Sequence, residues 1–104
     1  WYLGIDDVAA IPGVFALHQN YPNPFNPVTT IRYDVPEQSH VTMEIYNLLG
    51  QRVATLVNGI QEPGYHAILW NGTNMNGAAM SSGMYFYHIQ AGDFRAVKKL
   101  ILVK

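Results

Sequence analysis

The stretch "TTIRYDVPEQSHVTMEIYN" (residues 29–47) decides the predicted fold, because it alternates twice between apolar and polar side chains. The apolar positions of its two runs are Ile31, Tyr33 and Val35, then Val41, Met43 and Ile45. A period of two residues is typical of strands that bury one face and expose the other. The first run stops at Pro36, which cannot donate a backbone hydrogen bond. The stretch therefore predicts two half-buried strands joined by a turn.

Similar short runs occupy most of the remaining chain. Further strands are indicated near Phe15–His18 and in "LLGQRVATLV" (48–57), "YHAILWN" (65–71) and the two halves of "MYFYHIQAGDFRAVKKLILVK" (84–104). Turn signals separate them at Gly50, "NGIQEPG" (58–64), "NGTNMNGAAMSSG" (71–83) and Ala91-Gly92-Asp93. No segment has helical periodicity. About seven short strands with turns every eight to twelve residues or so predict an all-β fold, an immunoglobulin-like antiparallel β-sandwich.

Length and composition exclude several classes of function. A chain of 104 residues has room for one domain, and 49% apolar with 12% charged residues is typical of a folded protein. No apolar run is long enough for a membrane-spanning segment. A net charge of −1 gives no basic footprint for nucleic acid, and the absence of cysteine removes thiol catalysis, disulfides and thiolate metal sites.

The beginning of the sequence suggests that the chain follows another domain. Residue 1 is tryptophan, with neither an initiator methionine nor a signal peptide before the strand pattern begins. We expect residues 1–13 to be a linker or the end of a preceding domain, and residues 14–104 to form the β-sandwich.

The segment "NYPNPFNP" (20–27) predicts a rigid, ordered loop. Each proline fixes its own φ and pushes the preceding residue toward extended conformations; these prolines are Pro22, Pro24 and Pro27. We expect the rings of Tyr21 and Phe25 to fill the open end of the sandwich, with the three asparagine side chains bonding to backbone groups freed by the turns. A recognition role for this loop is the alternative.

The last strand, within "KKLILVK" (98–104), is apolar on both sides of its alternation, with Leu100 and Leu102 on one side and Ile101 and Val103 on the other. Such a strand is expected to be covered on both faces, by the N-terminal segment or by a partner. The lysines next to it have two expected roles. Guarding of the sheet edge is expected for Lys98 and Lys99, and a receptor contact for Lys104.

Aromatic residues have two interpretations. Trp70, Tyr85 and Tyr87 lie at strand positions where one sheet would pack on the other, and Gly83 closes the loop before that strand. Exposed rings on one sheet face would instead form a carbohydrate-binding platform. We count Trp70, Gly83 and Tyr85 with the proline-loop residues as structural or recognition positions.

Catalytic and metal-binding residues are not expected. Ser39-His40, Ser81 and Ser82 lack a nucleophile elbow or an ordered base. The loop "NGTNMNG" (71–77) offers only neutral amides, whereas calcium sites depend on carboxylates, so its Asn and Gly residues are expected to shape and cap the loop. The four histidines fall on four separate segments. No cofactor is therefore expected.

Four blocks together resemble a known family. "LHQNYPNPFNPVTTIRYDVPE", "VTMEIYNLLGQRVATLV", "PGYHAILWNG" and "SSGMYFYHIQAGDFRAVKKLILVK" are similar, in order and spacing, to the type A C-terminal sorting domain of the bacterial type IX secretion system. They are also similar to the Ig-like domain of the flagellar hook-capping protein. Where the family often has an acidic "WDG", this chain has Trp70-Asn71-Gly72, which weakens any metal-binding interpretation.

The resemblance implies a seven-stranded sandwich that ends a larger secreted protein, directs it across the outer membrane, and is then cleaved or linked to the cell surface. It implies an upstream cargo domain, the outer-membrane translocon and the surface-attachment machinery as partners, and no catalysis. Two alternatives stay open. One is a filament subunit, a homopolymer joined by strand addition through the N-terminal segment; the other is a carbohydrate-binding module.

Overall fold

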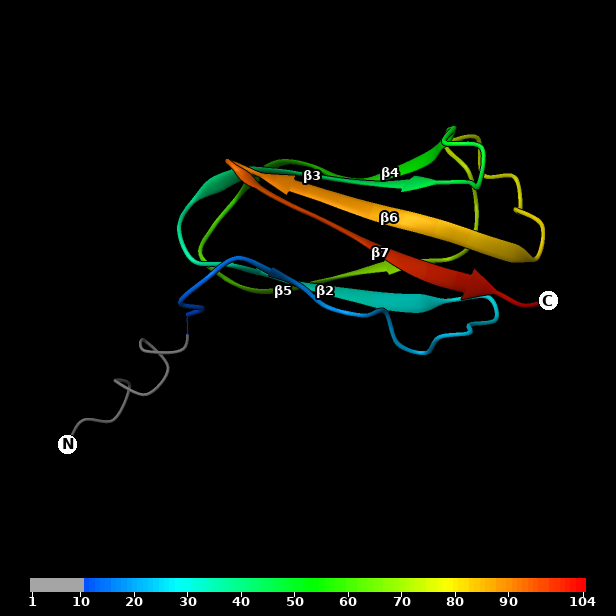
Figure 1. Ribbon diagram of the computed structural model, residues 1–104, viewed down its shortest axis with the longest axis horizontal. Coiled ribbons are helices and arrows are strands. Elements are labelled where there is room, and N and C mark those ends of the chain that lie inside the picture. The colour runs from blue at the N-terminus through cyan, green and yellow to red at the C-terminus, as the bar shows by residue number, and fades with distance from the viewer. Residues whose placement is uncertain (1–10) are drawn as a thin grey trace.

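Two antiparallel β-sheets packed face to face make up the fold of the computed structural model, which describes residues 11–104 (Figure 1). The strands are β1 (Ala16–Leu17), β2 (Thr29–Val35), β3 (Ser39–Tyr46), β4 (Arg52–Gln61), β5 (Gly64–Trp70), β6 (Gly83–Ala91) and β7 (Phe94–Leu102). One sheet has the order β1-β2-β5 and the other β4-β3-β6-β7. The predicted all-β sandwich of about seven strands is confirmed, and residues 11–104 contain no helix.

The alternation in sequence becomes the boundary between core and solvent. In β2 the buried side chains are Thr29, Ile31, Tyr33 and Val35, and in β3 they are Val41, Met43 and Ile45. Strand β6 adds Tyr85, Tyr87, Ile89 and Ala91 to the same core. The predicted inward faces of the first two runs are therefore confirmed.

Strand β4 departs from simple alternation because its pairing with β3 is irregular. The register shifts between Met43 and Glu44 and again between Ile45 and Tyr46. Each shift leaves an extra residue on β4, which changes the side of the sheet to which the next residue points. The neighbouring residues Val53 and Ala54 are consequently both buried.

The predicted turn at residues 58–64 is wrong in its first half. Asn58 and Gly59 continue β4 and pair with Thr42 and Val41 of β3. The φ angle of Gly59 is not positive, so this glycine does not supply a left-handed turn conformation. The turn is confined to Glu62 and Pro63, where the chain crosses from the four-stranded to the three-stranded sheet.

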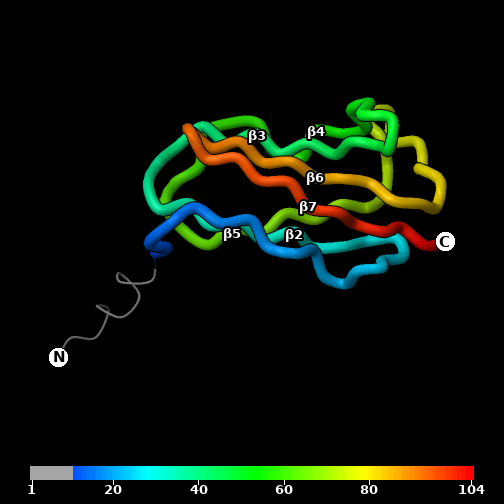
Figure 2. Tube along the Cα trace, in the orientation of Figure 1, coloured from blue at the N-terminus to red at the C-terminus, as the bar shows by residue number. Residues whose placement is uncertain are grey.

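The position of β4 distinguishes this sandwich from the constant-type immunoglobulin arrangement. In that arrangement the fourth strand belongs to the sheet of strands one, two and five. Here β4 pairs with β3, which leaves β5 at the edge of a three-stranded sheet. Figure 2 shows the segment before β1 and the C-terminal residues at opposite ends of the sandwich.

The segment before β1 contacts the first residue of β7. The ring of Phe15 stacks on that of Phe94, with centroids 5.5 Å apart and planes 13° from parallel. Most of the predicted linker, residues 1–10, lies outside the described part of the chain. The domain boundary at residue 14 and strand addition by the N-terminal segment therefore remain predictions.

Candidate functional site

The segment 20–27, called the proline loop below, forms hydrogen bonds along the edge of the last strand, β7. The N–H of Phe25 donates to the carbonyl of Ile101, and the N–H of Val103 donates to the carbonyl of Phe25, each over 2.9 Å. These bonds flank a parallel bridge between Phe25 and Leu102. The side-chain oxygen of Asn23 accepts a bond from the N–H of Ile101 at 2.9 Å. The loop, whose three X-Pro peptide bonds are cis, thus covers the C-terminal half of the β7 edge.

An aromatic cluster closes this end of the sandwich behind the loop. Phe25 and Trp70 are each 2% exposed and Tyr85 is 4% exposed. The ring centroid of Trp70 lies 5.7 Å from that of Phe25 and 5.7 Å from that of Tyr85. The indole N–H of Trp70 donates to the carbonyl of Thr73, and the hydroxyl of Tyr85 donates to the carbonyl of Ser81. The prediction that Trp70 and Tyr85 lie between the sheets is confirmed, and Phe25 occupies the expected position.

The expectation for Tyr21 is wrong. Its side chain is 74% exposed and does not fill the end of the sandwich. The reason is its backbone, which exchanges two hydrogen bonds with Thr30 and so extends the pairing of β2 by one bridge. That position directs the ring away from the core.

A buried hydrogen-bond network fixes the start of the loop. The N–H of Asn20 donates to the hydroxyl of Tyr87 at 2.8 Å, and this hydroxyl donates to the carbonyl of His18 at 2.6 Å. The amide of Asn20 donates to Thr29 Oγ1 at 3.0 Å and to the carbonyl of Pro22 at 3.2 Å. Burial raises the pKa of Tyr87 to about 12. Of the three loop asparagines, Asn20 and Asn23 therefore bond as expected, whereas the side chain of Asn26 forms no hydrogen bond within residues 11–104.

Gly72 is a position that the sequence analysis missed. Its φ is +75°, and a Cβ there would lie 3.4 Å from the carbonyl oxygen of Pro27 and 3.5 Å from Leu102 Cδ2. Gly72 thus lies where the proline loop and β7 approach the loop between β5 and β6 (residues 71–82). The dipeptide Asn71-Gly72 signals a turn, but the close approach of two distant segments leaves no trace in the local sequence.

The three lysines do not form one patch. Lys98 opposes buried Tyr87 and is half-buried, so it lies on the core-facing side of β7. Lys99 opposes Phe86 on the outer face and is exposed. Lys104 is exposed, and its N–H donates to Ser82 Oγ at 3.0 Å. Edge guarding and receptor contact remain predictions for them.

Cover over the second face of β7, by the N-terminal segment or by a partner, stays a prediction, because residues 11–104 do not supply it and residues 1–10 lie outside the described part of the chain. Leu100 and Leu102 are buried, but Ile101 is only half-buried and Val103 is 46% exposed. The strand lies at the edge of its sheet, and its outer face has no layer over it among residues 11–104. The proline loop covers its edge rather than this face, and the carbonyl of Lys99 accepts a bond from the side chain of Gln19 at 2.8 Å.

The loop between β5 and β6 is built by local capping, as predicted. The side-chain oxygen of Asn74 accepts bonds from the N–H groups of Asn76 and Ala78 at 2.9 and 3.0 Å. Gly77 has a φ of +81°. Gly83 begins β6 with a φ of 155°, and no atom lies within 4 Å of where its Cβ would be. A recognition role for Gly83 remains a prediction.

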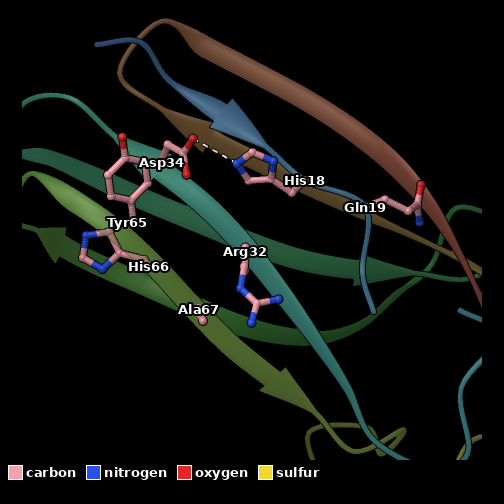
Figure 3. A pocket seen from close by; sticks show the side chains of 7 residues that line it. All are labelled: His18, Gln19, Arg32, Asp34, Tyr65, His66 and Ala67. Atoms are coloured by element: carbon pink, nitrogen blue, oxygen red, sulfur yellow. Dashed lines mark hydrogen bonds and ion pairs between the residues drawn. The ribbon is translucent and has the colours of Figure 1, made fainter. Parts of the chain in front are cut away.

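The histidines and acidic residues do not come together in a metal site within the described part of the chain. Within residues 11–104 no three His, Asp or Glu side chains lie close enough to hold a metal ion. His18 pairs with Asp34 at 2.9 Å on the outer face of the three-stranded sheet, beside Arg32 in a depression of about 420 Å³ (Figure 3). Exposed aromatic rings are scattered, with Tyr21 in the loop and Tyr65 on β5. None of the ring pairs between residues 11 and 104 joins two exposed rings, as a carbohydrate platform would require.

The fold is a small antiparallel β-sandwich. The proline loop, which comes early in the chain, forms hydrogen bonds with the edge of the last strand, β7. Residues 19–104 match the family described as the secretion system C-terminal sorting domain. The chain therefore belongs to this family. A helix suited to crossing a membrane is not found in residues 11–104.

Two solved structures with the same fold are of proteins from Porphyromonas gingivalis. A chain of dimeric latent PorU from Porphyromonas gingivalis is 23% identical, with a TM-score of 0.70 over 91% of this chain and 10% of that one. PorZ, described as an essential bacterial surface component of the type-IX secretion system of the same organism, is 18% identical, with a TM-score of 0.59 over 86% of this chain and 12% of that one. The chain thus spans about a tenth of these proteins. Comparison with curated proteins gives no match.

Proposed function

We propose that this chain is a non-catalytic sorting and anchoring domain that directs a secreted bacterial protein through the type IX system to the cell surface. Membership of the sorting-domain family supports this role, and the two structures of similar fold are large proteins of which such a domain is a small part. The partners in this proposal are an upstream cargo domain, the outer-membrane translocon and the surface-attachment machinery.

The observation that carries the proposal is the closure of β7 by the proline loop. Hydrogen bonds between Phe25 and residues 101 and 103 hold the last strand in the fold, while the side chains of Val103 and Lys104 stay exposed. A receptor thus meets a fixed, accessible end rather than a frayed one. Pre-ordering of this kind lowers the entropic cost of binding.

The test is export of a reporter. Residues 1–104, fused behind a reporter that enters the periplasm, are expected to carry it to the surface of a bacterium that has this secretion system. The same fusion in a strain without the system provides the baseline. Retention of the reporter in the periplasm of the competent strain would contradict the proposal.

Matched variants locate the surface that is read. Val103→Asp changes an exposed side chain next to the closed edge, and Ile60→Asp makes the same change at a residue that is 60% exposed on β4. Both variants are expected to fold, as judged by circular dichroism. Loss of export with Val103→Asp but not with Ile60→Asp would support recognition of the C-terminal end, and equal export of both would contradict it.

A further inference from the structure

The three-stranded sheet has an edge, strand β5, with which no strand or loop within residues 11–104 pairs. Strand β5 pairs with β2 on one side, and on its other side no strand pairs with it within residues 11–104. No loop in this part of the chain forms a backbone hydrogen bond with Gly64–Trp70, in contrast to the edge of β7. An uncovered edge of this kind is a template for pairing with another chain.

The hydrogen bonds of β2 show which groups of β5 point outward. Thr30 exchanges its backbone bonds with Tyr21, and the carbonyl of Arg32 accepts from the N–H of His18, so both residues direct their backbone groups away from β5. In an antiparallel pair, directly opposed residues turn their N–H and C=O groups either toward each other or both away.

The partners of these residues on β5 therefore present free backbone groups. Leu69 opposes Thr30 and Ala67 opposes Arg32, so their N–H and C=O groups point to the uncovered edge. By alternation the same holds for Tyr65, which opposes Asp34. Three donors and three acceptors thus line the edge.

The side chains of the same three residues lie on the outer face of the sheet. Tyr65 is 65% exposed, Leu69 is 62% exposed, and Ala67 is exposed between them. Figure 3 shows Tyr65 and Ala67 along β5, on the side of the sheet that carries Arg32 and Asp34. Gly64–Trp70 contains no charged residue and no proline, the features that usually protect a sheet edge.

We propose that β5 pairs antiparallel with β5 of a second copy of this chain, around a two-fold axis at Ala67. In this register Ala67 meets Ala67 of the second copy, and each Tyr65 meets a Leu69. Each of these three pairs exchanges two backbone bonds, about six in all. The two three-stranded sheets become one continuous sheet.

A second copy fits because the edge is complementary to itself. The twofold register pairs an aromatic ring with an aliphatic side chain at both ends, a combination that stabilises neighbouring strands, and it opposes no like charges. The free backbone groups fall at the same three positions on both copies. Because the same patch serves both partners, the assembly closes as a dimer and does not grow into a fibre. The inference depends on the sheet edge alone, so export and dimerisation can fail independently.

The first test places a charge at the two-fold axis. Sedimentation equilibrium measures association of the 104-residue chain at protein concentrations from about 1 μM to 1 mM. Ala67→Lys places two lysines opposite each other and is expected to raise the dimer dissociation constant about tenfold or more. Ala67→Glu should do the same, and a mixture of the two variants should associate again. Val97→Lys is the matched control, at a residue that is 58% exposed on β7. A chain that stays monomeric at 1 mM, or a dimer indifferent to charge at residue 67, would overturn the proposal.

Cross-linking provides a second test that does not depend on affinity. The chain has no cysteine, so a variant with one substitution has a single reactive thiol. Ala67→Cys places two thiols on directly opposed residues, whose Cα atoms in such a pair are about 5.5 Å apart, within disulfide range. Mild oxidation is expected to give a disulfide-linked dimer with Ala67→Cys and none with Val97→Cys. Equal cross-linking of both variants, or of neither, would contradict pairing at this edge.

Discussion

Replacing Tyr87 by phenylalanine tests the network that fixes the start of the proline loop. The ring stays and only the hydroxyl is lost, which accepts a bond from the N–H of Asn20 and donates one to the carbonyl of His18. Tyr87 is fully buried and Asn20 is 2% exposed, so solvent cannot replace these partners without rearrangement.

The expected loss follows from these two bonds. A hydrogen bond contributes about 1 kcal/mol net, and a buried donor left unpaired costs about 1–3 kcal/mol. Tyr87→Phe should therefore lower the free energy of unfolding by about 2–4 kcal/mol, a large part of the roughly 5–15 kcal/mol that is typical of a domain. The corresponding fall in Tm is about 4–8 °C per kcal/mol for a domain of this size.

Urea unfolding followed by tryptophan fluorescence measures this loss, with an unchanged slope m as the sign of an intact fold. Tyr65→Phe is the matched control, because it removes a hydroxyl from a side chain that is 65% exposed. It should change stability by less than about 0.5 kcal/mol. If Tyr87→Phe cost no more than the control, the reasoning about the buried network would be refuted.

The same residue predicts a dependence on pH. Burial raises the pKa of Tyr87 to about 12, above its ordinary value of 10.0, so the folded state favours the neutral phenol. Its contribution is fully present below pH 10 and is lost as the pH rises from about 10 to about 12. The loss is on the order of 3 kcal/mol. Tyr87→Phe should flatten this part of the stability profile, and a profile identical to that of the parent chain would contradict the assignment.

Four further changes test the aromatic cluster, Gly72 and the three lysines. Trp70→Ala should cost about 3–5 kcal/mol in urea unfolding, and a loss below about 1 kcal/mol would contradict its place in the core. Gly72→Ala should cost about 1–3 kcal/mol and more than Gly77→Ala, because both have positive φ but only Gly72 has neighbours within 4 Å; equal losses would contradict the close approach. Lys104→Gln should stay folded by circular dichroism and lose reporter export, and normal export would remove its receptor role. Replacing Lys98 and Lys99 by glutamine should leave export intact and increase aggregation, because these lysines are expected to guard the sheet edge. Loss of export would instead indicate that the export machinery recognises their positive charge.

Local pattern was sufficient to predict the strands with regular pairing. The alternation of β2 and β3 survives in the structure because each buries one face against the opposite sheet. In β4 the signal failed, because the extra residues opposite β3 break the period and Asn58-Gly59 has the composition of a turn. Only pairing with Thr42 and Val41 shows that these two residues continue the strand.

The candidate site could be predicted only in part for a similar reason. The three prolines predict a rigid loop. The local sequence does not distinguish Phe25, which packs on Trp70, from Tyr21, which faces solvent. Gly72 matters because Pro27 and Leu102 approach it from distant parts of the chain. Such convergence depends on how the sheets stack, and a one-dimensional pattern does not encode it directly.

The bonds between the proline loop and β7 also set an order of events in folding. Asn23 and Ile101 are 78 positions apart, so this closure waits until nearly the whole domain has been synthesised. Contacts of such long separation form slowly, because the intervening chain must first be ordered. A chain that stops short of residue 101 leaves Phe25 and the surrounding aromatic cluster without their cover. Protease resistance of this end should therefore distinguish chains that include Val103 from chains that stop before Ile101.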